Sequence, residues 1–116
     1  MKAYIIDDEE AIRMLLSALL NREGIETESH EKIEGAVEVA KKFQADVIFL
    51  DLSLKDGSGF SIIPDLRKVN PQAEIVIISA HTNESELEHA RALSVKHFLP
   101  KPLNRELILN TLKEIF

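Results

Sequence analysis

Polar side chains follow four of the five short apolar runs in this 116-residue chain. Asp7 and Asp8 follow the first run, Asp51 the third, Ser79 the fourth and Lys101 the fifth. Three carboxylates that lie close together repel, and a hard divalent cation such as Mg²⁺, which prefers oxygen ligands, relieves that repulsion. A lysine opposite the metal completes the usual apparatus for holding a phosphoryl group. The residue types therefore predict a magnesium site that handles phosphoryl groups, provided that the fold brings these residues together.

Short apolar runs alternate with stretches in which apolar residues recur at helical spacing. The runs at 2–6, 25–29, 47–50, 74–78 and 95–99 are typical of β-strands, and 47–50 is continuously apolar, as in a strand covered on both faces. Apolar stripes predict helices over 11–20, 33–43, 62–69, 87–93 and 107–115, and a loop with two glycines over 53–59. The pattern predicts an α/β fold of five βα units, (βα)5, that forms one domain over residues 1–116.

Strict βα alternation forces parallel strands with right-handed crossovers, so helices cover both faces of a doubly wound, five-stranded parallel sheet. We expect the flavodoxin-like strand order 2-1-3-4-5, in which functional sites lie at the carboxyl ends of the strands, beside the switch between strands 1 and 3. Asp7, Asp8 and Asp51 flank that switch in the expected fold, and Ser79 and Lys101 follow the neighbouring strands. This fold would therefore bring these residues together, as a site for magnesium and a phosphoryl group requires.

The composition argues against several other classes of protein. The chain has no cysteine, which excludes disulfide scaffolds, thiolate metal sites and thiol nucleophiles. It has 20 acidic and 14 basic residues, and this net charge of -6 argues against direct binding of nucleic acid, which needs clustered lysine and arginine. Its apolar stretches are far shorter than the roughly 20 residues of a membrane span. We therefore expect a cytoplasmic protein without a membrane or nucleic-acid partner.

Four motifs, in this order and at this spacing, carry a family resemblance. They are IIDDE at 5–9, IFLDLSLKDGSG at 48–59, VIISA at 76–80 and FLPKP at 98–102. Over nearly its whole length the chain resembles the response-regulator receiver domain of two-component (His-Asp) signalling. It departs from the usual pattern at Lys55, where many receivers have proline, and at Ser94-Val95, where Gly-Ala is frequent. It also has Phe98 in place of tyrosine, so the side chain at that position lacks a hydroxyl group.

The resemblance implies a role for each residue of the site. Asp51 is the phosphoacceptor, and Asp8, Asp51 and the main-chain carbonyl of Ser53 hold Mg²⁺, while Asp7 is oriented toward the metal through water. Lys101 pairs with the phosphoryl group.

The resemblance also implies a conformational switch. Ser79 stabilises the phosphoryl group by a hydrogen bond, and Ser79 and Phe98 change conformation when the chain is phosphorylated. The phosphoryl donor is phosphohistidine on a sensor histidine kinase or a phosphotransfer protein. The chain then promotes its own phosphorylation and dephosphorylation, and it is not an enzyme that turns over a separate substrate. An output domain or downstream protein is expected on the face formed by the fourth and fifth helices, with Glu86, His89, Lys96, His97, Phe98 and Arg105.

Two further residues are expected to set the lifetime of the phosphoryl group. Ser53 lies two residues after Asp51, and His81 lies two residues after Ser79. If the two strands end as expected, these side chains flank the path of an attacking water molecule. Imidazole can accept a proton from water near neutral pH.

Three other functions are compared with the receiver hypothesis. A magnesium-dependent phosphatase with an aspartyl nucleophile needs an acid two residues after the nucleophile, where this chain has Ser53. A flavodoxin-like electron carrier would place the phosphate of FMN beside residues 7–10, whose four carboxylates would repel it. A phosphorylation-independent interaction module has no need of the acids, serine and lysine that are all present here, and a phosphorylation assay decides between it and the switch.

Overall fold

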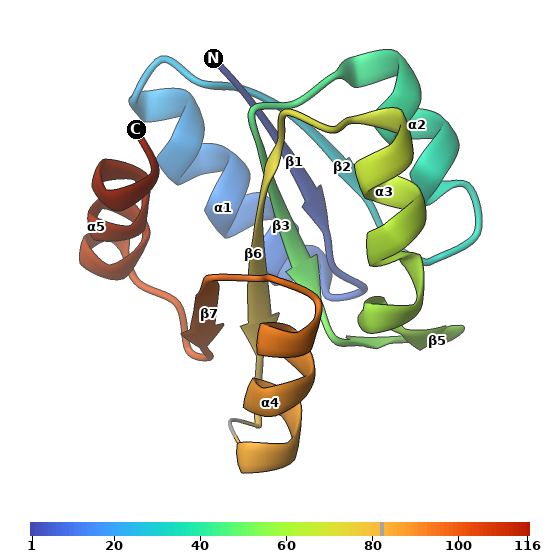
Figure 1. Ribbon diagram of the computed structural model, residues 1–116. Helices are drawn as coiled ribbons and strands as arrows, with labels where there is room; N and C mark the ends of the chain where they lie inside the picture. The colour runs from blue at the N-terminus through green and yellow to red at the C-terminus, as the bar shows by residue number, and fades with distance from the viewer. Residues whose placement is uncertain (82) are drawn as a thin grey trace.

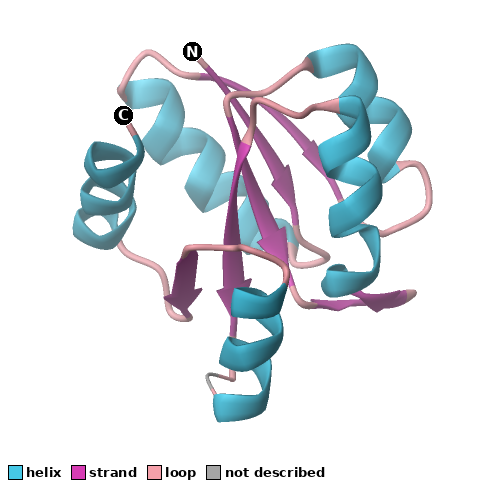
Figure 2. Ribbon diagram, in the orientation of Figure 1, coloured by secondary structure: helices cyan, strands magenta, loops and turns pink. Residues whose placement is uncertain are grey.

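A five-stranded parallel sheet lies between two layers of helices in the computed structural model, which describes residues 1–81 and 83–116 (Figures 1 and 2). The strands are β1 (Lys2–Ile6), β2 (Glu26–His30), β3 (Val47–Asp51), β6 (Glu74–Ser79) and β7 (His97–Pro100). They are arranged in the order β2-β1-β3-β6-β7, and each neighbouring pair is parallel. This order confirms the predicted 2-1-3-4-5 arrangement, because β4 and β5 form a separate short hairpin.

Each face of the sheet packs against its own layer of helices and forms its own core. On one side lie α1 (Glu10–Arg22) and α5 (Arg105–Ile115), and on the other lie α2 (Ala36–Phe43), α3 (Ile63–Val69) and α4 (Glu84–Ala92) (Figure 1). Alternate residues of the central strands separate into the two cores, as the two-residue period of a strand requires. Tyr4, Ile6, Ile48, Leu50 and Ile77 face the three-helix layer, and Ala3, Ile5, Val47, Phe49, Val76 and Ile78 face the two-helix layer.

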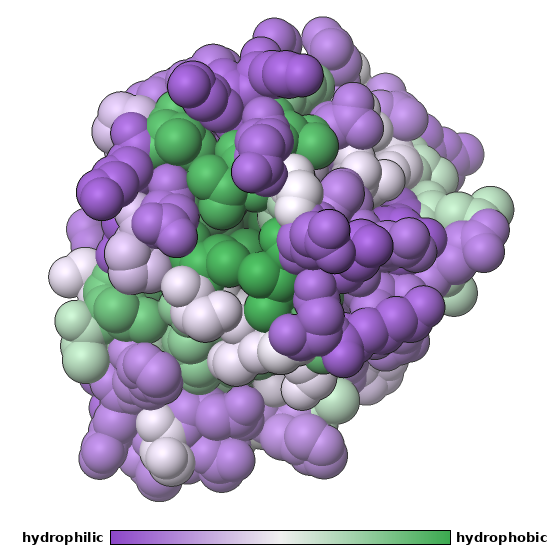
Figure 3. All heavy atoms as spheres, turned by 90° about the vertical axis from the view of Figure 1, so that its right-hand side faces the viewer, coloured by the Kyte–Doolittle hydropathy of each residue, from purple (hydrophilic) through white to green (hydrophobic). Residues whose placement is uncertain are grey.

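The side formed by α2 and α3 keeps some apolar surface at the exterior. Figure 3 views this side, and hydrophobic side chains gather in the middle of it between hydrophilic ones. Val37, Val39, Phe43 and Val69 of these two helices pack against the core but are only partly buried. Among the residues that the structure describes, none of the helices has the length and apolar character needed to cross a membrane.

The segment before α2 differs from the prediction of a helix that starts at residue 33. The helix begins only at Ala36, because Gly35 has a left-handed backbone with φ of 84°. The amide groups of Ile33 and Glu34 donate instead to the two carboxylate oxygens of Asp56, at 2.8 and 3.0 Å. Ile33 therefore contributes to the apolar stripe of the sequence without belonging to the helix.

The segment after β3 is more ordered than the predicted loop over residues 53–59. It contains the antiparallel hairpin of β4 (Ser53–Leu54) and β5 (Gly57–Ser58), followed by the 3₁₀ helix η1 (Gly59–Ile62). Asp56 lies in the turn of this hairpin and connects it to the segment that precedes α2. The chain directly after Asp51 is thus fixed by tertiary hydrogen bonds.

The last strand also begins later than predicted, at His97 instead of residue 95. Ser94 has a left-handed backbone with φ of 59°, and the amide of Val95 donates to the carbonyl of Ala90 at 2.9 Å, so both residues belong to the turn that follows α4. Val95 is buried, which explains why it resembles a strand residue in the sequence. Asp51 and Ser79 are the final residues of β3 and β6, whereas the sequence placed them just beyond the strands.

Gly59 packs directly against the backbone of Asp51. A Cβ atom on Gly59 would lie 2.2 Å from the carbonyl oxygen of Asp51, and backbone atoms cannot swing away as a side chain does. We expect Gly59→Ala to lower the free energy of unfolding by about 2 kcal/mol, as overpacked substitutions do. Denaturant unfolding measures this loss.

Gly24→Ala is the matched control for this steric effect. Gly24 has φ of 78°, but a Cβ atom on it would meet nothing within 4 Å, so this substitution costs only the left-handed backbone conformation, about 1 kcal/mol. Equal losses in the two variants would contradict the close approach of Gly59 to Asp51.

Candidate functional site

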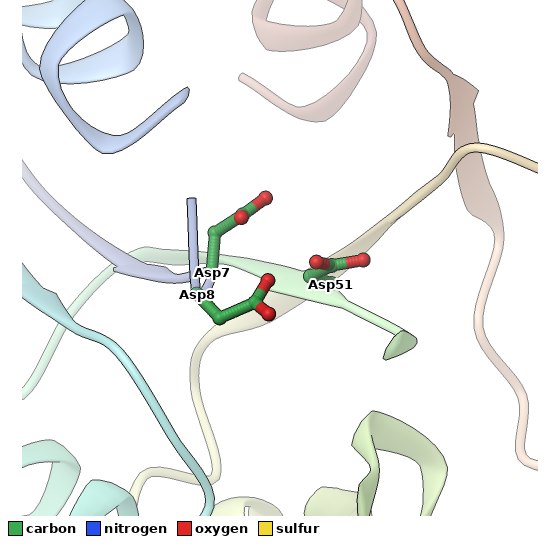
Figure 4. Close-up of side chains that lie close together, drawn as sticks. All are labelled: Asp7, Asp8 and Asp51. Carbon is green, nitrogen blue, oxygen red and sulfur yellow. The ribbon is translucent and has the colours of Figure 1, made fainter. Parts of the chain in front are cut away.

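Three carboxylates meet where β1 and β3 end. Figure 4 shows Asp7, Asp8 and Asp51 with their carboxyl groups directed into the same space, and one oxygen of each lies within 4.8 Å of the others. The pairing of Ile6 with Leu50 in neighbouring strands brings these residues together. Asp7 and Asp51 are almost completely buried, at 0% and 3% exposure, and Asp8 is partly buried. The convergence predicted from the sequence is present.

Backbone contacts fix Asp7 at the end of β1. Its amide donates to the carbonyl of His30, and its Oδ1 accepts the amide of Glu9 at 2.8 Å. The guanidinium of Arg13 donates to its carbonyl oxygen at 2.8 Å. Asp7 Oδ2 is left without a hydrogen-bond partner among the described residues, although it is buried.

Lys101 lies opposite the acids. Its Nζ is 3.4 Å from Asp51 Oδ2 and 3.2 Å from Asp7 Oδ2. The contact with Asp7 is an ion pair without a hydrogen bond. The same Nζ donates to Glu9 Oε1 at 3.0 Å. β7 pairs with β6, and the amide of Lys101 donates to the carbonyl of Ser79 at 2.8 Å. The sheet therefore positions Lys101 beside the aspartate residues.

Burial makes the ionised acids unfavourable. Desolvation, reinforced by the charge of Asp7, raises the pKa of Asp51 to about 6, although Lys101 and the amide of Ser53 act in the opposite direction. Burial likewise raises the pKa of Asp7, against the effect of the Glu9 amide and of Lys101. For Lys101, burial alone would lower the pKa, but the hydrogen bond to Glu9 and the charges of Asp7 and Asp51 raise it.

These observations show that the acidic cluster fits a hard divalent cation. All of its donors are carboxylate oxygens, the ligands that such cations prefer. Asp7 Oδ2 is a buried oxygen that lacks a hydrogen bond, and Lys101 balances only part of the negative charge. A cation would therefore relieve both the repulsion and the missing contact.

Ser53 and Ser79 differ in whether they contact the aspartate cluster. The amide of Ser53 donates to Asp51 Oδ1 at 3.2 Å, and the Ser53 side chain is exposed. The hydroxyl of Ser79 donates to the carbonyl of His81 at 2.6 Å and accepts the amide of His81 at 3.1 Å. The His81 side chain is exposed. Ser79 is thus engaged with the segment that leads to α4 and makes no hydrogen bond to the acids among the described residues.

Phe98 occupies β7 opposite Ile77 of β6 and is partly buried against the core of the three-helix layer. It therefore lies on the side of the sheet that α4 covers.

Side chains connect α4 to the neighbouring elements. The ring of His89 stacks on Phe60 of η1, with centroids 4.0 Å apart, and Arg67 of α3 donates to the carbonyls of Leu93 and Ser94. Of the residues predicted to form the output face, Lys96 and Arg105 are exposed, whereas Glu86 and His97 are partly buried. His89 stacks on η1 but remains exposed, so it stays available on the predicted face.

Sequence reasoning missed the contact of Glu9 with Lys101. Glu9 is the N-cap residue of α1, where serine, threonine, aspartate or asparagine is preferred. In the sequence, the one feature that indicates a role for Glu9 beyond capping is a glutamate at this position, directly after two aspartates.

Comparison with known proteins assigns the chain to a family. Residues 3–113 match the response regulator receiver domain. The response regulator protein PilR of Pseudomonas aeruginosa is 31% identical over 116 residues, which cover 97% of this chain and 26% of PilR, so the chain spans about a quarter of that relative. The chemotaxis protein CheY of Thermotoga maritima is 26% identical over 116 residues, 98% of this chain and 96% of that protein.

A solved structure shares the fold. A response regulator from Burkholderia pseudomallei, with a phosphorylated aspartic acid, a calcium ion and citrate, superposes with a TM-score of 0.89 at 28% identity, over 96% of this chain and 65% of that one. The sequence match, the strand order and the acids at the strand ends agree, and the chain therefore belongs to the response regulator receiver domain family.

Proposed function

We propose that this receiver domain accepts a phosphoryl group on Asp51, with Mg²⁺, from phosphohistidine of a sensor histidine kinase or a phosphotransfer protein. One observation carries the proposal: both oxygens of the buried Asp51 carboxylate are already held, Oδ1 by the amide of Ser53 and Oδ2 by Lys101. A nucleophile oriented before its donor arrives avoids much of the entropic cost of the reaction.

The transfer follows from this geometry. A carboxylate oxygen of Asp51 attacks phosphorus, the P–N bond to the imidazole of the donor breaks, and its electron pair leaves with the imidazole nitrogen. The transition state is loose, so charge neutralisation at the equatorial oxygens matters most, and Lys101 supplies it from one side. Asp8, Asp51 and the carbonyl of Ser53 would hold Mg²⁺, with Asp7 acting through water, and the bound cation would add positive charge to that of Lys101.

Ser79 connects this chemistry to α4. Its hydroxyl now donates to the carbonyl of His81, and a charged phosphoryl oxygen is a stronger acceptor than a neutral carbonyl. A hydroxyl that turns to the phosphoryl group releases His81 and the segment before α4. Phe98, beneath that layer, then changes its conformation, and the equilibrium shifts toward the state that a partner recognises.

Receiver domains are signalling switches, and the family membership favours this function over the aspartyl phosphatase and the electron carrier. We further propose that an output domain or downstream protein binds the face formed by α4, β7 and α5. The phosphorylation-independent interaction module is the alternative that the following experiment decides.

Phosphorylation by a small donor tests the proposal. We expect acetyl phosphate with Mg²⁺ to add one phosphoryl group, detected by intact-protein mass spectrometry, and excess chelator to prevent it. The exposed Asp56→Asn variant should keep the modification, because Asp56 contacts the segment before α2 and not the acidic cluster. Labelling that persists in chelator, or no labelling of the wild-type chain, would contradict the proposal.

The lifetime of the phosphoryl group provides a further prediction. We expect Ser53→Arg to slow dephosphorylation by crowding the approach of water, since Ser53 is exposed beside Asp51. We expect His81→Ala to lengthen the lifetime as well, because the variant lacks an imidazole that orients water. Dephosphorylation rates with Mg²⁺ measure both effects, and Ser61→Arg, at an exposed serine of η1, is the control. If all the rates are the same, neither residue borders the attacking water.

A further inference from the structure

Glu9 has an unusual position for a helix cap. It is the N-cap residue of α1, but its side chain makes no capping hydrogen bond to the helix. Instead, its Oε1 accepts a hydrogen bond from Lys101, 92 residues away in the chain, at 3.0 Å. This is the shortest of the contacts that Lys101 makes with acidic groups. The side chain of Glu9 thus contacts Lys101 of the site and does not cap the helix.

The contacts of Lys101 leave little capacity for a new acceptor. Its Nζ donates hydrogen bonds to Glu9 and Asp51 and forms an ion pair with Asp7 at 3.2 Å, so three carboxylates surround the ammonium group. The lysine side chain is only 12% exposed, so water offers it few alternatives. A phosphoryl oxygen that pairs with Lys101 therefore competes with these three carboxylates for the ammonium group.

Exposure decides which carboxylate leaves. The side chains of Asp7 and Asp51 are 0% and 4% exposed, and each would lose a cationic neighbour without gaining water. Glu9 is 58% exposed, and water can solvate its carboxylate once it separates from Lys101. Glu9 also lies outside the three-carboxylate cluster that fits a metal ion. It is the partner that costs least to release, as is usual for an exposed ion pair.

We propose that Glu9 is a positioning residue that holds Lys101 before phosphorylation and is displaced from it by the phosphoryl group. The inference rests on the function proposed above and adds to it a carboxylate that competes with the phosphoryl group for the same ammonium. In this arrangement Glu9 keeps Lys101 at the site in the unphosphorylated chain. The competing charge also makes the phosphorylated state less favourable than Lys101 alone would make it.

Equilibrium binding of beryllofluoride, a tetrahedral anion that takes the place of a phosphoryl group on aspartate, isolates this competition from any catalytic step. Glu9→Gln keeps the length and an acceptor oxygen but removes the charge. At low ionic strength we expect the Kd for beryllofluoride, measured with Mg²⁺ from the NMR signal of the Asp51 amide, to fall about 3- to 5-fold. Added salt should reduce the difference, because Glu9 is exposed.

Glu10→Gln is the matched control. Glu10 is exposed, neighbours Glu9 and carries the same charge, but it makes no contact with Lys101. We expect its variant to change the Kd by less than about 2-fold. A second readout follows displacement directly: in the wild-type chain, beryllofluoride should move the side-chain carboxyl ¹³C signal of Glu9 and leave that of Glu10 in place.

The outcomes separate the two proposals. Tighter binding by Glu9→Gln alone, with a moving Glu9 signal, supports the displacement. An unchanged or weaker Kd, an equal effect of Glu10→Gln, or a stationary Glu9 signal overturns it while the phosphoacceptor stands. If beryllofluoride leaves the Asp51 amide of the wild-type chain unaffected, the proposed function fails, and the role of Glu9 fails with it.

Discussion

Asp51→Asn is expected to abolish phosphorylation and, in metal-free buffer above pH 6, to make the folded chain more stable. The pKa of Asp51 is raised by burial and by Asp7 from 3.8 to about 6, so the folded state binds a proton more tightly than the unfolded state does. Stability contributed by the protonated acid is therefore lost as the pH rises from about 4 to about 6. Asparagine carries no charge and avoids this loss. The raised pKa already includes the attraction of Lys101, and we expect a net gain of about 1–2 kcal/mol.

Thermal melts between pH 4 and 8 in excess chelator measure the effect. Asp56→Asn is the control with the opposite sign: backbone amides of Ile33 and Glu34 lower the pKa of the exposed Asp56, so its carboxylate stabilises the fold at neutral pH and the variant should melt earlier. Mg²⁺ should raise the melting temperature of the wild-type chain more than that of Asp51→Asn. An Asp51→Asn variant that melts well below wild type at pH 7 in chelator would mean that this carboxylate is structural.

Ser79→Ala is expected to accept the phosphoryl group but to lose its long-range effect. The hydroxyl of Ser79 is the group that bonds both the carbonyl and the amide of His81, at the start of the segment before α4. Alanine cannot exchange that bond for one to a phosphoryl oxygen, so nothing connects the phosphoryl group to α4 and Phe98. Because a ligand shifts an equilibrium only through differential contacts, we expect the transmitted change to disappear almost entirely.

Amide chemical shifts before and after phosphorylation report this loss. In the wild-type chain the shifts of α4 and β7 should change together with those around Asp51, whereas in Ser79→Ala only the latter should change. Ser61→Ala, which removes an exposed hydroxyl that donates to the carbonyl of Ser58, should behave like the wild type. Changes at α4 of equal size in Ser79→Ala would show that another residue transmits the signal.

The architecture was predictable because it depends on local patterns and on rules of parallel sheets. Apolar runs and stripes identify strands and helices, and strict alternation leaves few strand orders. The convergence of Asp7, Asp8 and Asp51 follows from that order, since β1 and β3 are neighbours whose carboxyl ends meet. The sequence therefore indicated the acidic cluster without any side-chain coordinates.

The remaining features depend on contacts between segments that a pattern does not connect. The late start of α2 results from hydrogen bonds between Asp56 and amides more than 20 residues earlier. The pairing of Glu9 with Lys101 spans 92 residues and depends on how far two flexible side chains reach. The hydroxyl of Ser79 donates to the carbonyl of His81 and not to a carboxylate of the site, and only the structure shows which acceptor it contacts.

Site-resolved trapping of the acyl phosphate identifies the residue that accepts the phosphoryl group. The wild-type chain is incubated with acetyl phosphate and Mg²⁺, reduced with borohydride, which converts an aspartyl phosphate to homoserine, and mapped by peptide mass spectrometry. We expect homoserine at position 51, in place of Asp51 in the peptide that contains the end of β3, and only when Mg²⁺ is present. Homoserine at position 7 or 8, or a stable phosphate on a serine or histidine with position 51 unmodified, would contradict it.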